Sequence, residues 1–230
     1  MSGMVRQVVM LLVIVVSLSL PAAHPVHAEG DGAWLDSPTV VWNDAGQSIP
    51  EAPPFAPDND PRCLEQLQPA ASDAARMVEA AGWKMYGEDL TDGNVRIVRA
   101  LAAFDGMCRP MEYQAFAFTA STPPQFIGTL SPTAMGSRTD GALNRLELVN
   151  QDRIVARYSR YTDQDALCCP SAISTVTFRV EQRGASAVLV RMSTVTEPTS
   201  AAASPTPSSP SLPSPPASPV QAPVQAPRSR

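Results

Sequence analysis

"STVTFRVE", residues 174–181, decides the fold class, because from Thr175 onward its side chains alternate between polar and apolar. The apolar members are Val176, Phe178 and Val180, and threonine or arginine fills the positions between them. Successive side chains of a β-strand point to opposite faces. The stretch therefore predicts a strand of an antiparallel sheet that has one face in the core and the other in water.

Five further stretches have a strand-like composition and are separated by short, turn-like segments. They are EYQAFAFTA (112–120), QFIGTL (125–130), NRLELV (144–149), RIVARYSRY (153–161) and SAVLVRM (186–192). VRIVRALAAF (95–104) fits a strand or a helix. A short helix precedes them, with Ser72 as a candidate N-cap and Gly82 as a candidate C-terminal cap. We expect a disulfide-stabilised α+β domain, in which an antiparallel β-sheet of about five to six strands packs against one short N-terminal helix.

Composition divides the chain into four parts. Residues 1–28 combine Arg6, an apolar run and a final Val-His-Ala, which is typical of a cleaved signal peptide. Residues 29–62 form a proline-rich, extended lead-in, and residues 63–196 the predicted globular domain. Residues 197–230 form a tail rich in proline, serine and alanine that we expect to be disordered. The protein should therefore be exported, secreted or held in the cell envelope, without a membrane span after cleavage.

The only two histidines, His24 and His27, lie in the predicted signal peptide. Its removal leaves no imidazole, which excludes Ser-His-Asp and Cys-His catalysis and histidine-ligated metals. The chain has 17 basic and 22 acidic residues. This excess of acid disfavours nucleic acid and anionic membranes as partners. We expect no catalytic residue, no cofactor and no metal site.

Cys168 and Cys169 are adjacent in a chain that has only four cysteines. Neighbouring side chains of an extended segment point in opposite directions, so we expect these two to bond to Cys63 and Cys108, in an order that the sequence leaves open. A bridge from Cys108 would close a loop of about 60 residues and stabilise the fold by about 4 kcal/mol. A Cys168–Cys169 ring, a reactive thiol and a four-thiolate metal site are the alternatives.

The densest cluster of charge lies between residues 138 and 165. It contains Arg138, Arg157 and Arg160 together with two aspartates, and Tyr158 and Tyr161 stand beside the arginines. The cluster fits a solvated sheet face with cross-strand ion pairs. It also fits a surface that binds an anion or a carboxylate, because arginine forks match planar oxyanions. We take these three arginines and two tyrosines as the possible binding residues.

Several acidic residues lie in turn-like stretches of sequence. Two carboxylates at a suitable separation could hydrolyse a glycoside, and Asp105, Asp140 and Asp163 are the candidates to test. The segment EDLTDGN (88–94) carries oxygen ligands for calcium but lacks the EF-hand spacing. Aspartate is favoured in turns for local reasons, which is the simpler interpretation of all these residues.

Five short motifs together resemble the LppP/LprE-type lipoproteins of bacteria and their secreted relatives. They are FDGMCRP (104–110), FIGTLSP (126–132), SRTDGAL (137–143), RYTD (160–163) and LCCPS (167–171). The resemblance runs from about residue 63 to residue 181. It implies an exported envelope protein with structural disulfides and a compact mixed fold, and it implies no particular reaction. No cysteine stands at the predicted cleavage site, so we expect a non-lipidated relative.

These observations favour a non-enzymatic module that binds an unknown protein or a small ligand at the cell envelope or outside the cell. A hydrolase that uses paired carboxylates on a glycan or an ester is one alternative. An extracellular inhibitor or interaction domain is another, and it would use exposed loops such as residues 131–141.

Overall fold

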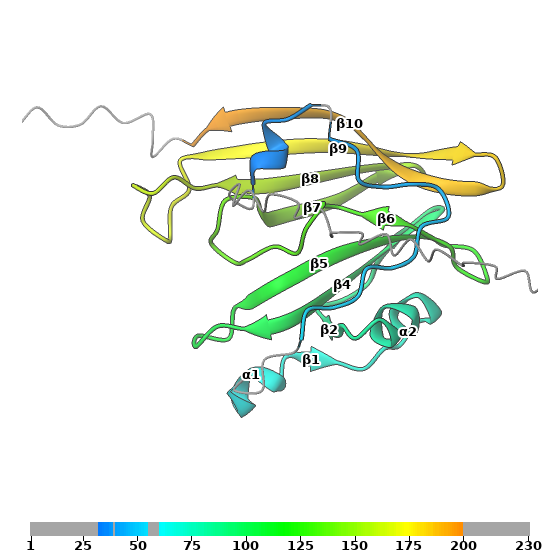
Figure 1. The fold of residues 1–230 in the computed structure, drawn as a ribbon, viewed down its shortest axis with the longest axis horizontal. Helices are drawn as coiled ribbons and strands as arrows, with labels where there is room; N and C mark the ends of the chain where they lie inside the picture. Colours follow the sequence, from blue (N-terminus) through cyan, green and yellow to red (C-terminus); the bar gives the residue numbers. More distant parts are fainter. Residues whose placement is uncertain (1–31, 39, 55–59, 200–230) are drawn as a thin grey trace, which may run out of the picture.

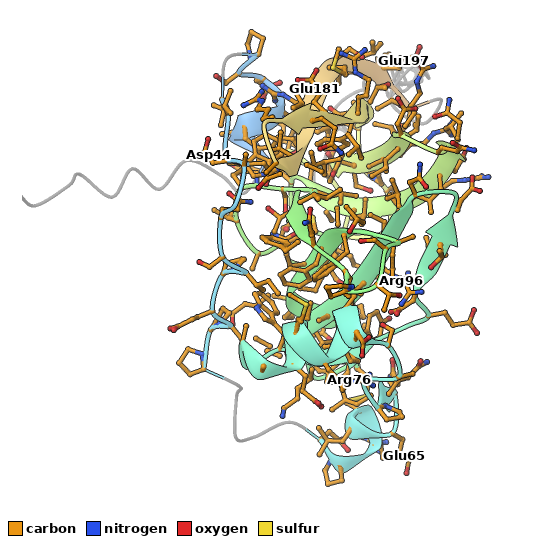
Figure 2. The ribbon with its side chains drawn as sticks, turned by 90° about the vertical axis from the view of Figure 1, so that its right-hand side faces the viewer. Asp44, Glu65, Arg76, Arg96, Glu181 and Glu197 are labelled. Atoms are coloured by element: carbon orange, nitrogen blue, oxygen red, sulfur yellow. A yellow bond between two sulfur atoms is a disulfide. The ribbon has the colours of Figure 1, made fainter. Side chains whose placement is uncertain are left out.

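Two antiparallel β-sheets lie face to face, and a helix covers the outer side of one of them (Figure 1). The computed structural model describes residues 32–38, 40–54 and 60–199. In the perpendicular view of Figure 2, Glu181 and Glu197 mark the upper sheet, Arg96 marks the middle sheet and Arg76 marks the helical layer below. The part of the chain that is described is therefore built in three layers.

Short helical segments and two sets of strands make up these layers. The helical segments are η1 (Ala33–Leu35), α1 (Pro61–Leu64) and α2 (Asp73–Ala80). One sheet consists of β1 (Leu67–Gln68), β2 (Lys84–Tyr86), β3 (Leu90–Asp92), β4 (Val95–Phe104), β5 (Pro110–Thr119) and β6 (Phe126–Thr129). The other consists of β7 (Ala142–Asn150), β8 (Arg153–Arg160), β9 (Ala172–Arg183) and β10 (Ser186–Pro198). The six-stranded sheet has the order β1-β2-β4-β5-β6, with β3 also paired to β4, and the four-stranded sheet has the order β10-β9-β8-β7.

The alternating stretch at 174–181 forms the centre of β9, as predicted. Val176 and Phe178 are fully buried in the core between the two sheets. Thr175 and Thr177 are only partly buried and Arg179 is exposed, so they form the outer face of the four-stranded sheet. The strand therefore has one buried face and one face toward solvent, as its sequence predicts.

Strand β4 is buried on both faces, and for this reason its sequence does not distinguish a strand from a buried helix. Ile97 and Leu101 belong to the core between the sheets. Val98 and Ala100 belong to a second core, which lies between the six-stranded sheet and α2. Central position, rather than local preference, makes this stretch almost continuously apolar.

Helix α2 begins and ends where its capping residues predict. The Ser72 hydroxyl accepts a hydrogen bond from the backbone N–H of Ala75 at 3.1 Å, which satisfies one of the free donors of the first turn. Gly82 follows the last turn with a φ of +94°, a left-handed conformation that favours glycine. Ala74 and Val78 are fully buried against the six-stranded sheet. This apolar stripe fastens the helix to the sheet.

Part of the predicted lead-in closes the gap between the edges of the two sheets. The Asn43 amide donates to the carbonyl oxygens of Thr129 in β6 (3.0 Å) and Leu189 in β10 (3.1 Å). Its oxygen accepts from the backbone N–H of Thr129 at 2.9 Å. Gly128 permits this approach, because a Cβ there would lie 2.4 Å from the Asn43 side chain. A buried asparagine thus joins two strands that do not pair with each other directly.

The four cysteines form two disulfides, but these are not the predicted cross-links. Cys63 is bonded to Cys108, with their Cα atoms 4.8 Å apart, and Cys168 is bonded to Cys169. The predicted bonds from Cys63 and Cys108 to the adjacent pair are therefore wrong. The reason is the division of the strands into two sheets: α1 and the β4–β5 turn lie beside the six-stranded sheet, whereas the adjacent pair lies in the β8–β9 connection of the other sheet.

The predicted α+β class, with antiparallel strands and a short helix, is confirmed. The described residues divide these strands between two sheets, where the sequence predicts one. No helix among them is long and apolar enough to span a membrane. The predicted signal peptide (1–28) and most of the predicted tail (197–230) lie outside the described residues.

Candidate functional site

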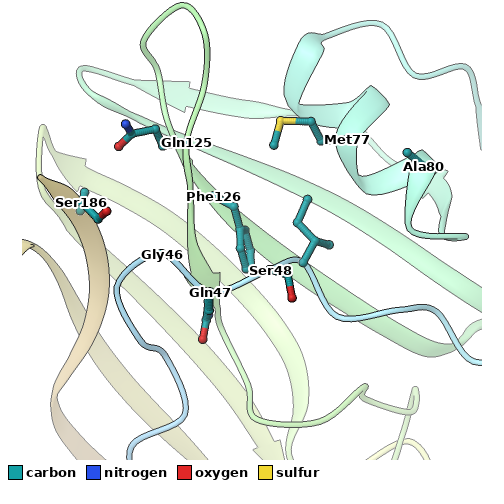
Figure 3. Close-up of a pocket in the computed structure, with 10 residues that line it drawn as sticks. Gly46, Gln47, Ser48, Met77, Ala80, Gln125, Phe126 and Ser186 are labelled. Carbon is teal, nitrogen blue, oxygen red and sulfur yellow. The ribbon is translucent and has the colours of Figure 1, made fainter.

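An open groove of about 560 Å³ lies where four segments that are far apart in the sequence meet (Figure 3). It is formed by residues 46–49, helix α2, the beginning of β6 and the beginning of β10. The lining residues are Gly46, Gln47, Ser48, Ile49, Met77, Ala80, Gln125, Phe126, Ser186 and Ala187. The ring of Phe126 stands in the middle of these side chains in Figure 3.

A tight turn shapes the wall that residues 46–49 contribute. The side-chain oxygen of Gln47 accepts a hydrogen bond from the backbone N–H of Asp44 at 2.9 Å. Its amide nitrogen donates to the side-chain oxygen of Asn43 at 3.1 Å. Gly46 has a φ of +77°, which a residue with a side chain adopts at a cost. The wall is therefore tied to Asn43, the residue that closes the gap between the sheets.

The helix and β6 supply the apolar part of the groove. The core side of α2 carries Ala74 and Val78, so Met77 projects beside it with 39% of its surface exposed. The Phe126 ring lies 5.5 Å from the ring of Phe118, measured between centroids, and is almost completely buried. A flexible thioether and a fixed aromatic ring thus form an apolar floor that can adapt to different shapes.

The groove lacks the groups that proton transfer requires. Among the described residues, no aspartate, glutamate, lysine, arginine, histidine, cysteine or tyrosine lines it. The hydroxyls of Ser48 and Ser186 have no neighbouring base in the lining, and a serine without one is a weak nucleophile. The polar groups of the lining are neutral amides and hydroxyls. The arrangement can hold an uncharged ligand by apolar contact and hydrogen bonds, and it supplies no acid or base.

The structure separates the five predicted binding residues. Tyr158 is fully buried, and its hydroxyl donates to the carbonyl oxygen of Leu130 at 2.6 Å. Arg157 points to the outer face of the four-stranded sheet and is exposed. Arg138 is exposed in the β6–β7 connection, and the Tyr161 hydroxyl donates to the Leu167 carbonyl at 3.3 Å. Alternation along β8 sends its tyrosine and its arginine to opposite faces, so Tyr158 cannot contribute to a surface site.

Arg160, the remaining member of that group, is held between two carboxylates. Its guanidinium pairs with Asp36 at 2.6 Å and with Asp140 at 2.8 Å. The hydrogen bonds that Arg160 donates to Asp36 are the main reason that the pKa of Arg160 lies above its ordinary value. The hydrogen bond from Arg160 likewise lowers the pKa of Asp36. This triad fastens the lead-in to the four-stranded sheet and leaves little of the arginine side chain accessible.

The candidate catalytic carboxylates have structural partners. Asp105 accepts hydrogen bonds from the backbone N–H groups of Met107 and Arg109, both at 2.9 Å, and pairs with the Arg109 guanidinium. Desolvation raises the pKa of Asp105, but these hydrogen bonds outweigh it and the pKa lies below its ordinary value. Asp140 is bound to Arg160, and Asp163 is exposed. Among the described residues, no group of three or more potential metal ligands occurs.

Residues 95–183, which run from β4 to the end of β9, match the family described as LppP/LprE lipoprotein. This part of the chain is similar to that family. The predicted resemblance is thereby confirmed over β4, β5 and β6 of the six-stranded sheet and β7, β8 and β9 of the four-stranded sheet. The comparisons with curated proteins and with solved structures find no match.

The LppP/LprE match indicates an envelope-associated protein and leaves its specific role open. The matched stretch contributes Gln125 and Phe126 to the groove, and the other lining residues lie outside it. Sequence reasoning missed the groove. The helix that carries Met77 and Ala80 was predicted. Nothing in the sequence, however, indicates that these two residues lie beside residues 46–49 or Ser186.

Proposed function

We propose that the chain is an envelope-associated, non-enzymatic module that binds a small, uncharged and largely apolar ligand in the groove. The observation that carries this proposal is a groove of about 560 Å³, which the described part of the chain lines with apolar and neutral polar side chains and with no ionisable one. Small-molecule sites have volumes of about 300–1,000 Å³ and are mostly apolar, with a few polar groups that orient the ligand. A charged ligand would lose its hydration here without gaining a counter-charge.

The polar groups at the rim favour a ligand that also makes neutral hydrogen bonds. Gln47 and Gln125 offer amides, and Ser48 and Ser186 offer hydroxyls. The Gln47 side chain is already held by Asp44 and Asn43. A wall that is fixed before binding loses little conformational entropy when the ligand arrives.

Titration with the neutral fluorophore N-phenyl-1-naphthylamine tests the proposal. The full chain should bind the probe saturably, with an increase in fluorescence. Met77→Gln should weaken binding about fivefold, because it removes apolar contact worth about 1 kcal/mol. Met107→Gln is the matched control, since Met107 is 64% exposed and lies outside the groove. Ala80→Trp, which fills the groove from an exposed helix position, should abolish binding.

Equal binding by the wild type and by the Ala80→Trp variant would overturn the proposal. So would a chain that does not bind the probe and self-associates through the groove, as light scattering would reveal. Circular dichroism of each variant separates loss of binding from loss of fold. The hydrolase alternative gains no support from the geometry, because Asp105 and Asp140 are each engaged with an arginine.

A loop-based inhibitor is likewise not favoured. Within the connection at residues 131–141, Ser131 and Met135 are buried. The backbone of Met135 exchanges two hydrogen bonds with that of Tyr113, at 2.9 and 2.7 Å. Thr133 and Arg138 are its exposed residues. A loop anchored in this way offers a partner little surface.

A further inference from the structure

An arginine interrupts the core-facing row of β4. Val95, Ile97 and Leu101 are buried in the core between the sheets. Alternate residues of a strand share a face, so Arg99 belongs to the same row. A cation that faces a core costs free energy unless an acceptor satisfies it. The position therefore requires an explanation that packing does not provide.

Arg99 lines a cleft of about 200 Å³ between the two sheets. The cleft opens on the side of β4 and β7, whereas Asn43 closes the other side, where β6 and β10 meet. Its lining includes Tyr86, Arg99 and Tyr113 from the six-stranded sheet and Leu143, Asn144 and Arg145 from β7. The two lateral sides of the sandwich thus differ. The described part of the lead-in closes the side where β6 and β10 meet, and it leaves the side with the cleft open.

The guanidinium of Arg99 is held in place and retains an unused donor. Its Nη2 donates to the carbonyl oxygen of Glu88 at 3.3 Å. Its Nε is inaccessible to solvent and has no hydrogen-bond partner within the described residues. Gly87, with a φ of +73°, lies against the guanidinium, and a Cβ there would be 2.6 Å from Nη2. A buried donor without an acceptor destabilises the fold, and a carboxylate placed against the guanidinium would offset this cost.

The cleft combines positive charge with apolar walls. Within the part of the chain that the structure describes, no aspartate or glutamate lines it. Arg145 lies opposite Arg157 in the β7–β8 pairing, so its side chain is on the outer face of the four-stranded sheet, where it pairs with Glu147 at 2.6 Å. Arg99 is therefore the cation that faces the cleft. The Tyr113 hydroxyl donates to the Leu143 carbonyl at 3.3 Å, and burial raises the pKa of this phenol, so it adds no negative charge. The electrostatic preference of the cleft is for an anion.

We propose that this cleft binds a small carboxylate. The charged group lies against Arg99, and the apolar part rests on Tyr113, Leu143 and Leu146. A guanidinium forms strong, charge-assisted hydrogen bonds with a planar carboxylate. A volume of about 200 Å³ is below that of sites for drug-sized molecules, so the ligand is a small acid. The cleft shares no residue with the groove, and the inference does not depend on the proposed function.

Calorimetric titration of the full chain with benzoate, benzamide and inorganic phosphate tests the proposal. Benzoate should bind saturably, and benzamide, which has the same shape without the charge, should not bind. Arg99→Gln should weaken benzoate binding at least tenfold. Arg96→Gln is the matched control: Arg96 lies on the same strand, and alternation along β4 places it on the face opposite to Arg99, where its Nε donates to the Thr91 hydroxyl at 3.2 Å. This control should bind benzoate like the wild type.

A second measurement keeps the test independent of how well Arg99→Gln folds. The Nε–H signal of Arg99 in the wild-type NMR spectrum is assigned by its absence in Arg99→Lys, and it should shift as benzoate is added. An unchanged signal would overturn the proposal, as would equal binding by Arg99→Gln and the wild type. Binding of phosphate in place of benzoate would overturn the assignment to a carboxylate.

Discussion

The two disulfides should differ sharply in what they contribute to stability. Replacing Cys63 and Cys108 together by alanine opens a loop with a sequence separation of 45 residues. In the chain-entropy model, such a loop stabilises the fold by about 4 kcal/mol. This is a large share, about a quarter or more, of the 5–15 kcal/mol that is typical of a domain. The buried position of Cys63 adds lost packing to this effect.

The matched control is the double replacement Cys168→Ala and Cys169→Ala. These residues are adjacent and exposed, so their bond restricts almost none of the unfolded chain. We expect a loss below about 1 kcal/mol. Urea titration followed by tryptophan fluorescence measures both losses, because Trp34 and Trp83 are buried in different cores. If the slope of the free energy of unfolding against urea concentration is the same in all proteins, their unfolded states are comparable.

Equal losses in the two double variants would refute this reasoning, and so would a larger loss in the Cys168–Cys169 control. Peptide mapping of the non-reduced protein provides a direct check. A peptide that joins Cys168 or Cys169 to either of the other cysteines would restore the pairing predicted from the sequence.

Three further predictions concern local interactions. Asn43→Ala should lower the free energy of unfolding by about 2–3 kcal/mol, because the buried carbonyls of Thr129 and Leu189 lose a donor; a loss below about 1 kcal/mol in urea titration would contradict this. Ser72→Ala should cost about 1 kcal/mol through loss of the N-cap, and an unchanged unfolding midpoint would argue against the cap. Asp105→Asn should destabilise the protein near neutral pH. The pKa of Asp105 is lowered in the folded state from its ordinary 3.8, so its contribution is present above about pH 4 and is lost as the pH falls through the folded pKa. Urea midpoints of wild type and Asp105→Asn should therefore converge in acid, and a constant difference would refute the assignment.

How much of the molecule was predictable depends on the range of the interaction. The β9 strand and the capped helix α2 were predictable from neighbouring residues. Phe178 is part of an alternating row of side chains, and Ser72 caps a backbone N–H three positions later. The predicted binding cluster was not, since it grouped Tyr158 with Arg157 by proximity in the chain. In a strand these neighbours occupy opposite faces. The hydroxyl of the buried Tyr158 donates to the carbonyl oxygen of Leu130, which directly follows β6 of the six-stranded sheet.

The sequence by itself determined the antiparallel class, the position of helix α2 and the similarity to the LppP/LprE family. These depend on side-chain period, capping and short motifs, which are properties of neighbouring residues. Only the tertiary structure decided the disulfide pairing, the division into two sheets, the groove and the cleft around Arg99. Each of these requires contacts between segments far apart in the chain, such as the hydrogen bond from Asn43 to Leu189, across 146 positions. Such contacts depend on how whole layers pack, and local sequence patterns do not encode that arrangement.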